Sequence, residues 1–105
     1  MNKKYYFDER DINKLSEIGD DADVLFKWID ENMLPRKNAT RSTTSYGLKH
    51  IMERDIGLYV SNSSFKEAML IKGYEPVNPG DLNWFFCISK KSPCMVKRHQ
   101  ELINQ

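Results

Sequence analysis

The sequence predicts one mainly α-helical domain that carries a small β-hairpin. The chain has 105 residues, enough to enclose one hydrophobic core and too few for two. Apolar residues make up 40% of the chain and include five Phe, five Tyr and two Trp, so a stable core can form. Apolar side chains recur at helical spacing along most of the chain, whereas residues 74–88 show the alternation typical of strands.

Two helices are predicted in the N-terminal part. The segment 8–18 begins at Asp8, a suitable N-cap, and Gly19 offers a left-handed stop behind it. A second helix is predicted over residues 22–33, because its apolar side chains form one stripe and Pro35 follows it. The apolar residues at helical spacing are Ile12, Leu15 and Ile18 in the first segment and Leu25, Trp28, Ile29 and Met33 in the second.

The middle of the chain predicts a loop and two further helices. Residues 35–45 are polar, basic and free of large apolar groups, which is typical of a flexible loop. A third helix begins with Ser42 or Thr43 as its cap, runs to about residue 55 and buries Leu48, Ile51 and Met52. Residues 58–60 favour a strand, and a fourth helix over 64–72 is preceded by small polar residues that can act as N-caps.

The last third predicts a hairpin and a helix. Residues 74–77 form a short strand, Asn78–Asp81 fit a type II turn, and 82–88 alternate apolar and other side chains. Ser92 and Pro93 can open a C-terminal helix with an apolar stripe. That stripe consists of Met95, Val96, His99, Leu102 and Ile103.

The element order from residue 43 to 89 is helix, short strand, helix, strand, tight turn, strand. This is the order of a winged helix-turn-helix, in which the fourth helix would enter the major groove of DNA and residues 74–88 would form the wing. We therefore expect a single domain, 1–105, with an acidic helical part at 1–34. A winged-helix-like core at 43–89 and a C-terminal helix at 92–105 complete it.

The net charge of +1 hides an asymmetry along the chain. Residues 1–32 carry five Lys or Arg against nine Asp or Glu, and residues 33–105 carry eleven against six. This division can mean that an acidic face and a basic face of the protein meet different partners. It can also mean only that the solvent-exposed helix faces of the two parts differ in charge. The basic excess coincides with the winged-helix-like stretch and favours double-stranded DNA as a partner, bound by a protein that can form a homodimer.

The candidate nucleic-acid contacts come from four segments. Basic side chains of the loop and of the third helix would bind phosphates, and the polar N-terminal end of the fourth helix would reach base edges. Lysines near the base of the wing would add further phosphate contacts. The predicted residues are Arg36, Lys37, Arg41, Lys49, Asn62, Ser63, Lys66, Lys90 and Lys91.

Three stretches carry a family resemblance. They are the run from Thr44 to Arg54, the run from Tyr59 to Tyr74, and the pair Asn83 and Trp84. Together they resemble small winged-helix-like proteins carried by phages and mobile genetic islands of Gram-positive bacteria. The resemblance covers about residues 43–89. It implies a regulator or replication accessory and supplies no catalytic residue.

A protein-binding module is the competing hypothesis. Carboxylates crowded on short helices can imitate phosphate charge or dock on a basic groove. The chain would then be a phage or mobile-element inhibitor of a host or defence enzyme, such as an anti-CRISPR-type nuclease inhibitor. The residues proposed for that contact are Asp20, Asp21, Asp23, Asp30 and Glu31.

Catalysis and metal binding are not expected. Cys87, Cys94 and His99 have no recognised zinc-ligand spacing, and Cys87 is expected to be buried and Cys94 to be a surface thiol. The five glycines are scattered and form no phosphate-binding loop. No nucleophile is paired in sequence with His50 or His99. His99 is expected to pack with the apolar stripe of the C-terminal helix. We therefore expect a non-enzymatic protein without cofactor.

The aromatic residues and the chain's composition complete the expectations. Trp28 and Trp84 lie on apolar stripes and are expected in the core, although they could stack on single-stranded nucleic acid. Phe85 points the opposite way and is either covered by the C-terminal helix or exposed to a partner. With two cysteines, no bilayer-spanning apolar run and no apolar signal segment, a soluble cytoplasmic protein without a membrane partner is expected.

Overall fold

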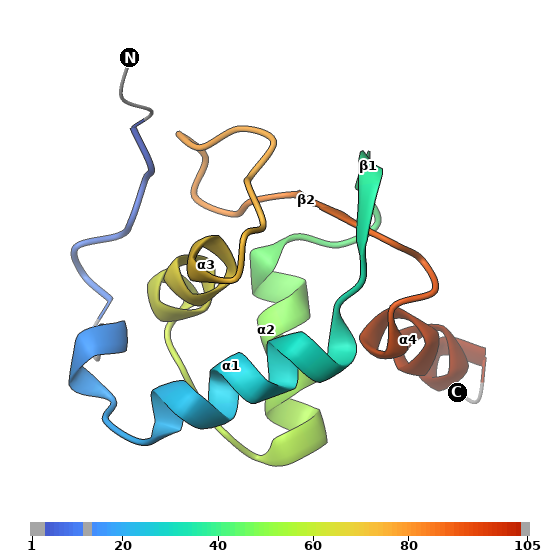
Figure 1. Ribbon diagram of the computed structural model, residues 1–105, viewed down its shortest axis with the longest axis horizontal. Helices are drawn as coiled ribbons and strands as arrows, with labels where there is room; N and C mark the ends of the chain where they lie inside the picture. The colour runs from blue at the N-terminus through green and yellow to red at the C-terminus, as the bar shows by residue number, and fades with distance from the viewer. Residues whose placement is uncertain (1–3, 12–13, 104–105) are drawn as a thin grey trace.

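Four α-helices and a two-stranded antiparallel sheet make up the computed structural model, which describes residues 4–11 and 14–103 (Figure 1). A short 3₁₀ turn, η1, precedes the first helix. The elements in chain order are η1 (Leu15–Glu17), α1 (Asp21–Asn32), β1 (Pro35–Thr40), α2 (Ser45–Ile56), α3 (Asn62–Ile71), β2 (Phe86–Ile88) and α4 (Pro93–Ile103). The prediction of a mainly α-helical domain with a small β-hairpin is confirmed in its coarser form, helices with a two-stranded antiparallel sheet; the strands that pair are β1 and β2, which α2 and α3 separate in the chain.

Helices α1 and α2 are present where predicted, because helical spacing of apolar residues is a local signal. The predicted cap of α2 at Ser42 or Thr43 is wrong, since Thr44 is its N-cap. All four stripe residues of α1 and all three of α2 are buried. Trp28 is 3% exposed, and its indole Nε1 donates to the Asp55 carboxylate on α2 at 2.8 Å. Trp84 is also buried, so both tryptophans belong to the core as predicted.

Helix α3 is the centre of the molecule. Gly57 ends α2 with a left-handed φ of 70°, and the Ser61 hydroxyl caps α3 by accepting the Ser64 N–H at 3.0 Å. Six residues of α3 are buried, and the helix packs against η1, α1 and α2. The buried residues of α3 are Ser63, Ser64, Phe65, Lys66, Ala68 and Met69, with Leu70 partly buried beside them.

The predicted helix over 8–18 is wrong. Residues 4–11, here called the N-terminal strap, are not helical: residues 4–8 have no regular secondary structure, and a turn follows in which the Asp11 N–H donates to the Asp8 carbonyl at 3.0 Å. In the described part of 8–18 only η1 is helical; Ile12 lies outside the described residues. Tyr5 and Phe7 pack on Trp84, with ring centroids 5.7 and 5.5 Å away. Residues two apart share a face only on an extended chain, so this packing requires a strand-like backbone.

The predicted loop over 35–45 is wrong for its first half, because residues 35–40 form β1 and pair with β2. The Thr40 hydroxyl donates to the Ile88 carbonyl, which fixes the end of the pairing. Between the paired positions β1 takes five residue steps and β2 takes two, so β1 bulges outward. Tertiary pairing overrides a sequence pattern that shows no strand alternation.

The predicted wing is also changed. Residues 58–60 form no strand, residues 74–77 contribute only an isolated bridge, Pro76 to Phe86, and the strand predicted over 82–88 is reduced to β2. A turn is present where predicted, since the Asp81 N–H donates to the Asn78 carbonyl at 3.1 Å. Gly80 lacks the positive φ of a type II turn, so the turn type was wrong.

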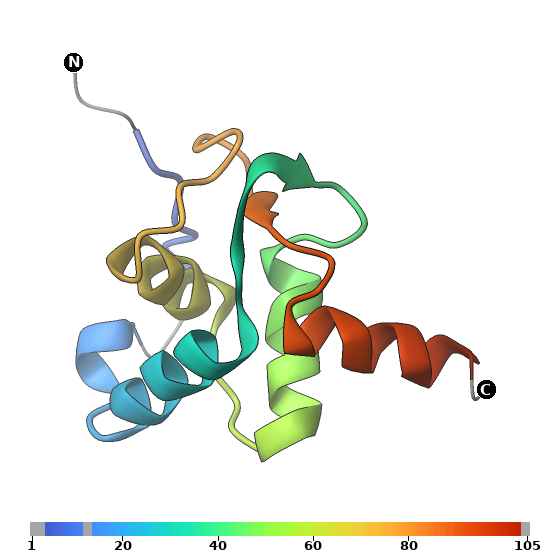
Figure 2. The same ribbon diagram turned by 45° about the vertical axis from the view of Figure 1, so that its right-hand side comes forward.

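Helix α4 extends away from the body of the domain (Figure 2). Its first turn is anchored by Cys94, which is fully buried with its Sγ 3.6 Å from the Met33 sulfur; burial raises the pKa of this thiol to about 11. The surface thiol predicted at position 94 is therefore wrong. His99 is exposed, contrary to the predicted packing, and Cys87 is only half-buried.

Candidate functional site

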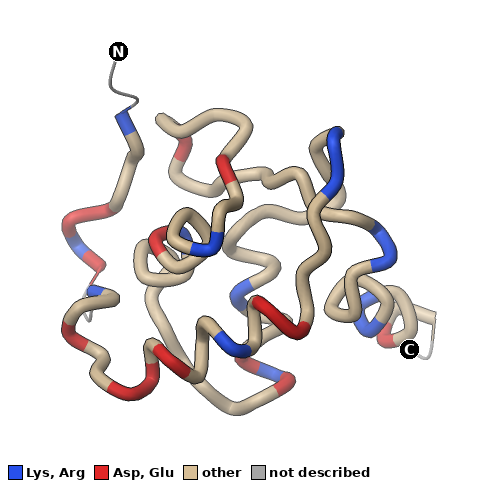
Figure 3. Tube along the Cα trace, viewed as in Figure 1, with Lys and Arg blue, Asp and Glu red and all other residues tan. Residues whose placement is uncertain are grey.

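The charge asymmetry along the chain becomes a division in space. Acidic residues occupy the strap, η1 and α1, whereas basic residues occupy β1, the turn after β2 and part of α4 (Figure 3). The strap and η1 lie on one side of the molecule and β1 and α4 on the other, in both ribbon views. The two predicted functions therefore correspond to different sides of the domain.

Five of the predicted nucleic-acid residues share the basic side and form what we call the basic face. Main-chain pairing brings their segments together: the Ser89 N–H donates to the Leu34 carbonyl at 2.7 Å, and the Leu34 N–H donates to the Ser92 hydroxyl at 2.9 Å. The turn after β2 is thereby fixed beside the start of β1. The basic face consists of Arg36, Lys37, Arg41, Lys90 and Lys91.

The cations of the basic face are available for ligands. Lys37, Arg41, Lys90 and Lys91 are exposed, and no carboxylate in the described part of the chain forms an ion pair with them or with Arg36. Arg36 is more constrained, because its guanidinium donates to two carbonyls of its own strand bulge at 2.7 Å each.

Phe85 lies under one of these cations. The Arg41 guanidinium carbon is 5.6 Å from the centroid of the Phe85 ring, which is half-buried. The Arg41 guanidinium therefore lies over the ring, a contact that neither of the two alternatives left open by the sequence included. Stacking on a ring holds a guanidinium in place while its N–H groups stay free to donate.

Lys66 was predicted to face DNA, and this prediction is wrong. Its side chain has no exposed surface, and its Nζ donates to the carbonyls of Tyr6 and, at 2.9 Å, of Leu82. The amine also lies 4.1 Å from the Trp84 ring centroid. Burial lowers its pKa from 10.5 to about 8, partly offset by the charges of Asp8, Asp11 and Asp81. Lys66 therefore joins the strap to the core.

Lys49 is also unavailable to phosphates. It is 4% exposed, and its Nζ lies 3.0 Å from the Glu53 carboxylate on the same helix. The same amine lies 4.8 Å from the centroid of the Tyr59 ring. Its charge is compensated inside the protein, so the predicted phosphate contact is wrong.

The N-terminal end of α3 is occupied by the strap. The Asp11 carboxylate accepts the Ser63 N–H at 3.1 Å and the Ser63 hydroxyl at 2.6 Å, and the same hydroxyl accepts the Asp8 N–H. Asn62 accepts from Ser45 and donates to Asn83 at 3.0 Å. A carboxylate thus sits where a phosphate would bind a helix N-terminus, so the predicted DNA contacts of Asn62 and Ser63 are not supported.

The acidic residues proposed for a protein partner are accessible. All five lie on the surface of α1 or at its cap, and only Asp30 has an ion-pair partner in the described ranges, the Lys72 amine at 2.8 Å. These residues are Asp20, Asp21, Asp23, Asp30 and Glu31. Asp20, Asp21 and Asp23 lie at the cap or in the first turn of α1, next to η1 in the chain, whereas Asp30 and Glu31 lie in its last turn, from which the chain leads directly into β1.

Sequence reasoning missed a pocket on the acidic side. It has a volume of about 470 Å³ and is formed by the strap, η1 and the one open face of α3. Its walls come from two segments of the chain, 7–15 and 63–71, that are separated by almost half of the sequence, so no motif could have revealed it. Its apolar lining consists of Phe7, Leu15, Leu70 and Ile71, and Glu9, Glu67 and Lys14 are among its charged residues.

Residues 4–11 and 14–103 contain no group of three or more His, Cys, Asp or Glu side chains placed to hold a metal ion. Over the same residues, no helix has the length and apolar character needed to cross a bilayer.

The chain matches no family model, no curated protein and no solved structure. The resemblance to small phage and mobile-island proteins accordingly stays a prediction.

Proposed function

We propose that the protein binds double-stranded DNA through the basic face, as a cytoplasmic, non-enzymatic regulator or replication accessory of a phage or mobile element. The observation that carries this proposal is the set of five cations on β1, directly after β1 and on the turn after β2, none of which pairs with a described carboxylate. Unpaired lysines and arginines on one side of a domain neutralise phosphates and release counterions. Contacts of this kind position a protein on DNA without reading its sequence.

The arrangement of elements supports a winged-helix module. Helices α2 and α3 follow one another and pack together, and the bridge at Pro76 and strand β2 come after them. Strand β1 lies between α1 and α2 in the chain and pairs with β2. In this proposal the sheet side meets DNA. Helix α3 does not enter the major groove, because the strap covers its N-terminal end.

Salt-dependent anisotropy measurements on a labelled duplex of about 20 base pairs test the proposal. We compare the wild type with the triple variant Lys37→Gln, Lys90→Gln and Lys91→Gln. The logarithm of affinity should fall linearly with the logarithm of salt, and removing three phosphate contacts should reduce the slope by about 2–3. Lys27→Gln, at an exposed position of α1 on the acidic side, is the matched control and should keep the wild-type slope.

Two results would overturn the proposal. One is the absence of duplex binding at about 50 mM salt, where phosphate-driven association is strong. The other is equal affinity of the triple variant and the wild type, because the basic face would then contribute nothing.

The exposed carboxylates of α1 favour a second function, the inhibition of a host or defence enzyme through a basic groove. Charge reversal at Asp20, Asp21 and Asp23 separates this function from the first. The reversed variant should lose a protein partner captured by the wild type from phage-infected cells, and it should retain DNA affinity. If capture is unchanged by the reversal, the acidic side is not the contact.

A further inference from the structure

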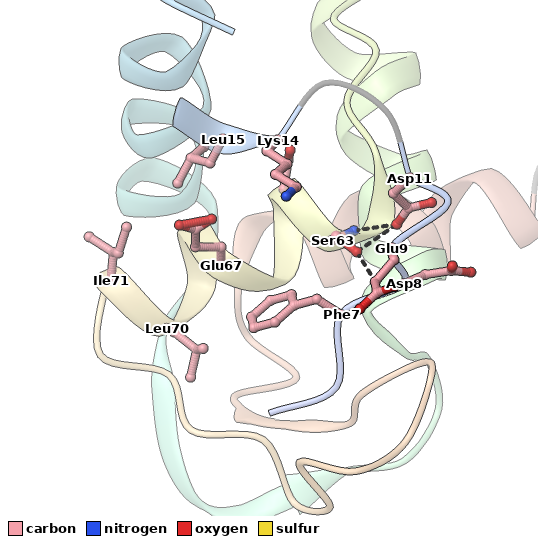
Figure 4. Close-up of a pocket in the computed structure, with 11 residues that line it drawn as sticks. Phe7, Asp8, Glu9, Asp11, Lys14, Leu15, Ser63, Glu67, Leu70 and Ile71 are labelled. Atoms are coloured by element: carbon pink, nitrogen blue, oxygen red, sulfur yellow. Dashed lines mark hydrogen bonds between the residues drawn. The ribbon is translucent and has the colours of Figure 1, made fainter. Parts of the chain in front are cut away.

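The open face of α3 points into the pocket on the acidic side. Most of α3 is buried, but Glu67, Leu70 and Ile71 remain accessible and lie one helical turn apart or side by side. Ile71, the last residue of α3, is 60% exposed, so part of the apolar lining of the pocket is uncovered. Figure 4 shows Glu67 between these aliphatic residues and Phe7 of the strap.

The lining of this pocket combines apolar side chains with carboxylates. Phe7, Leu15, Leu70 and Ile71 provide the apolar surface, and the volume of about 470 Å³ is within the range of roughly 300–1,000 Å³ typical of ligand pockets. Four carboxylates stand around this surface against the single amine of Lys14.

Two of these carboxylates are already engaged. Asp8 pairs with Arg10 at 3.0 Å, and Asp11 caps Ser63. Glu9 and Glu67 have no hydrogen bond or ion pair with any residue the structure describes. The pocket therefore offers two free negative charges beside an uncovered apolar surface.

We propose that this pocket binds a basic peptide segment of a partner protein, with one large apolar side chain inserted against Leu70 and Ile71. The negative charges of Glu9 and Glu67 favour a basic partner, because these carboxylates would pair with lysines or arginines on either side of the inserted residue. A nucleic acid is excluded by the same carboxylates. The inference goes beyond DNA binding and names the partner chemistry for the acidic side, which lies away from the basic face.

Nuclear magnetic resonance titration of the ¹⁵N-labelled protein with three short peptides tests this inference. The first peptide is Lys-Arg-Leu-Arg-Lys, the second replaces its leucine with alanine, and the third is Glu-Asp-Leu-Asp-Glu. We expect saturable shifts of the Leu15, Glu67, Leu70 and Ile71 amides with the first peptide. Its affinity should exceed that of the alanine peptide at least threefold, and the acidic peptide should cause no shift.

Matched variants complete the test. The double variant Glu9→Gln and Glu67→Gln should weaken the first peptide about fivefold to tenfold, and Asp21→Asn with Asp23→Asn, which removes two acids outside the pocket, should weaken it less than twofold. Equal losses in the two double variants would overturn the inference, because diffuse attraction would then explain binding. Equal affinity of the leucine and alanine peptides would also overturn it, as would the absence of any amide shift at millimolar concentrations of the first peptide. DNA affinity is measured in parallel. None of these contradicting peptide results bears on it, so failure of the peptide-binding proposal can be distinguished from failure of the DNA-binding proposal.

Discussion

Replacing Lys66 with methionine tests whether this residue serves the fold or a ligand. The native amine is fully buried between the strap and Trp84, and burial lowers its pKa from 10.5 to about 8. Methionine keeps a chain of similar length and polarisability without a charge. The variant therefore removes one titration and leaves the apolar contacts of the side chain largely in place.

The sign and size of the effect follow from linkage. Below pH 8 the amine is protonated in both states, and the folded state bears the cost of a buried charge. Between pH 8 and 10.5 the unfolded state binds more protons than the folded state, so stability rises with pH. Each unit of pKa difference corresponds to about 1.4 kcal/mol, which gives a rise of about 2.5 kcal/mol between pH 7 and pH 10.

Urea denaturation followed by tryptophan fluorescence measures this rise. Other groups titrate in this range too, among them Cys94 with its raised pKa, and they contribute equally to both proteins. The free energy of unfolding of the wild type relative to that of Lys66→Met should therefore increase by about 2.5 kcal/mol between pH 7 and pH 10. Lys90→Met, which removes an exposed lysine, should keep the wild-type pH dependence. If Lys66→Met shows the same rise as the wild type, the buried amine is not its source and the structural role assigned to Lys66 is refuted.

Three further predictions concern the core. The hydrogen bond from the Trp28 indole holds the pKa of Asp55 below its ordinary value. The difference in free energy of unfolding between the wild type and Asp55→Asn should therefore be largest above about pH 4 and shrink as the pH falls below it. A difference that does not change with pH would contradict this. Ser61→Ala should cost about 1 kcal/mol in urea denaturation because α3 loses its cap, and a cost under about 0.3 kcal/mol would contradict the capping role. Cys94, buried with a raised pKa, should react with iodoacetamide far more slowly than Cys87, as read by mass spectrometry; equal rates would show that α4 opens easily.

The sequence predicted those features that depend on neighbours in the chain. Helix α1 follows from the spacing of its buried residues, and the end of α2 follows from Gly57, because both signals are local. Strand β1 was missed because only Thr40 of its residues is buried, so the strand exists through its pairing with β2. A polar strand at a sheet edge has no periodic signature.

The candidate site was predicted in part for the same reason. The exposed cations of the basic face are visible as cations in the sequence, and the structure leaves them accessible. Lys66 looked identical to them, because the first turn of a helix is usually solvated. Its burial depends on Tyr6, 60 positions earlier in the chain, and no local pattern reports a contact at that separation.

The strap also has a consequence for the order in which the protein forms. Its native partners are Ser63, Pro79 and Trp84, and the Tyr6 N–H donates to the Pro79 carbonyl at 2.7 Å. A ribosome releases these first residues long before it has made their partners. The beginning of the chain must therefore wait without its partners during synthesis: Asp11 can cap α3 only after Ser63 has emerged, and the strap is fully anchored only after Pro79 and Trp84 have followed.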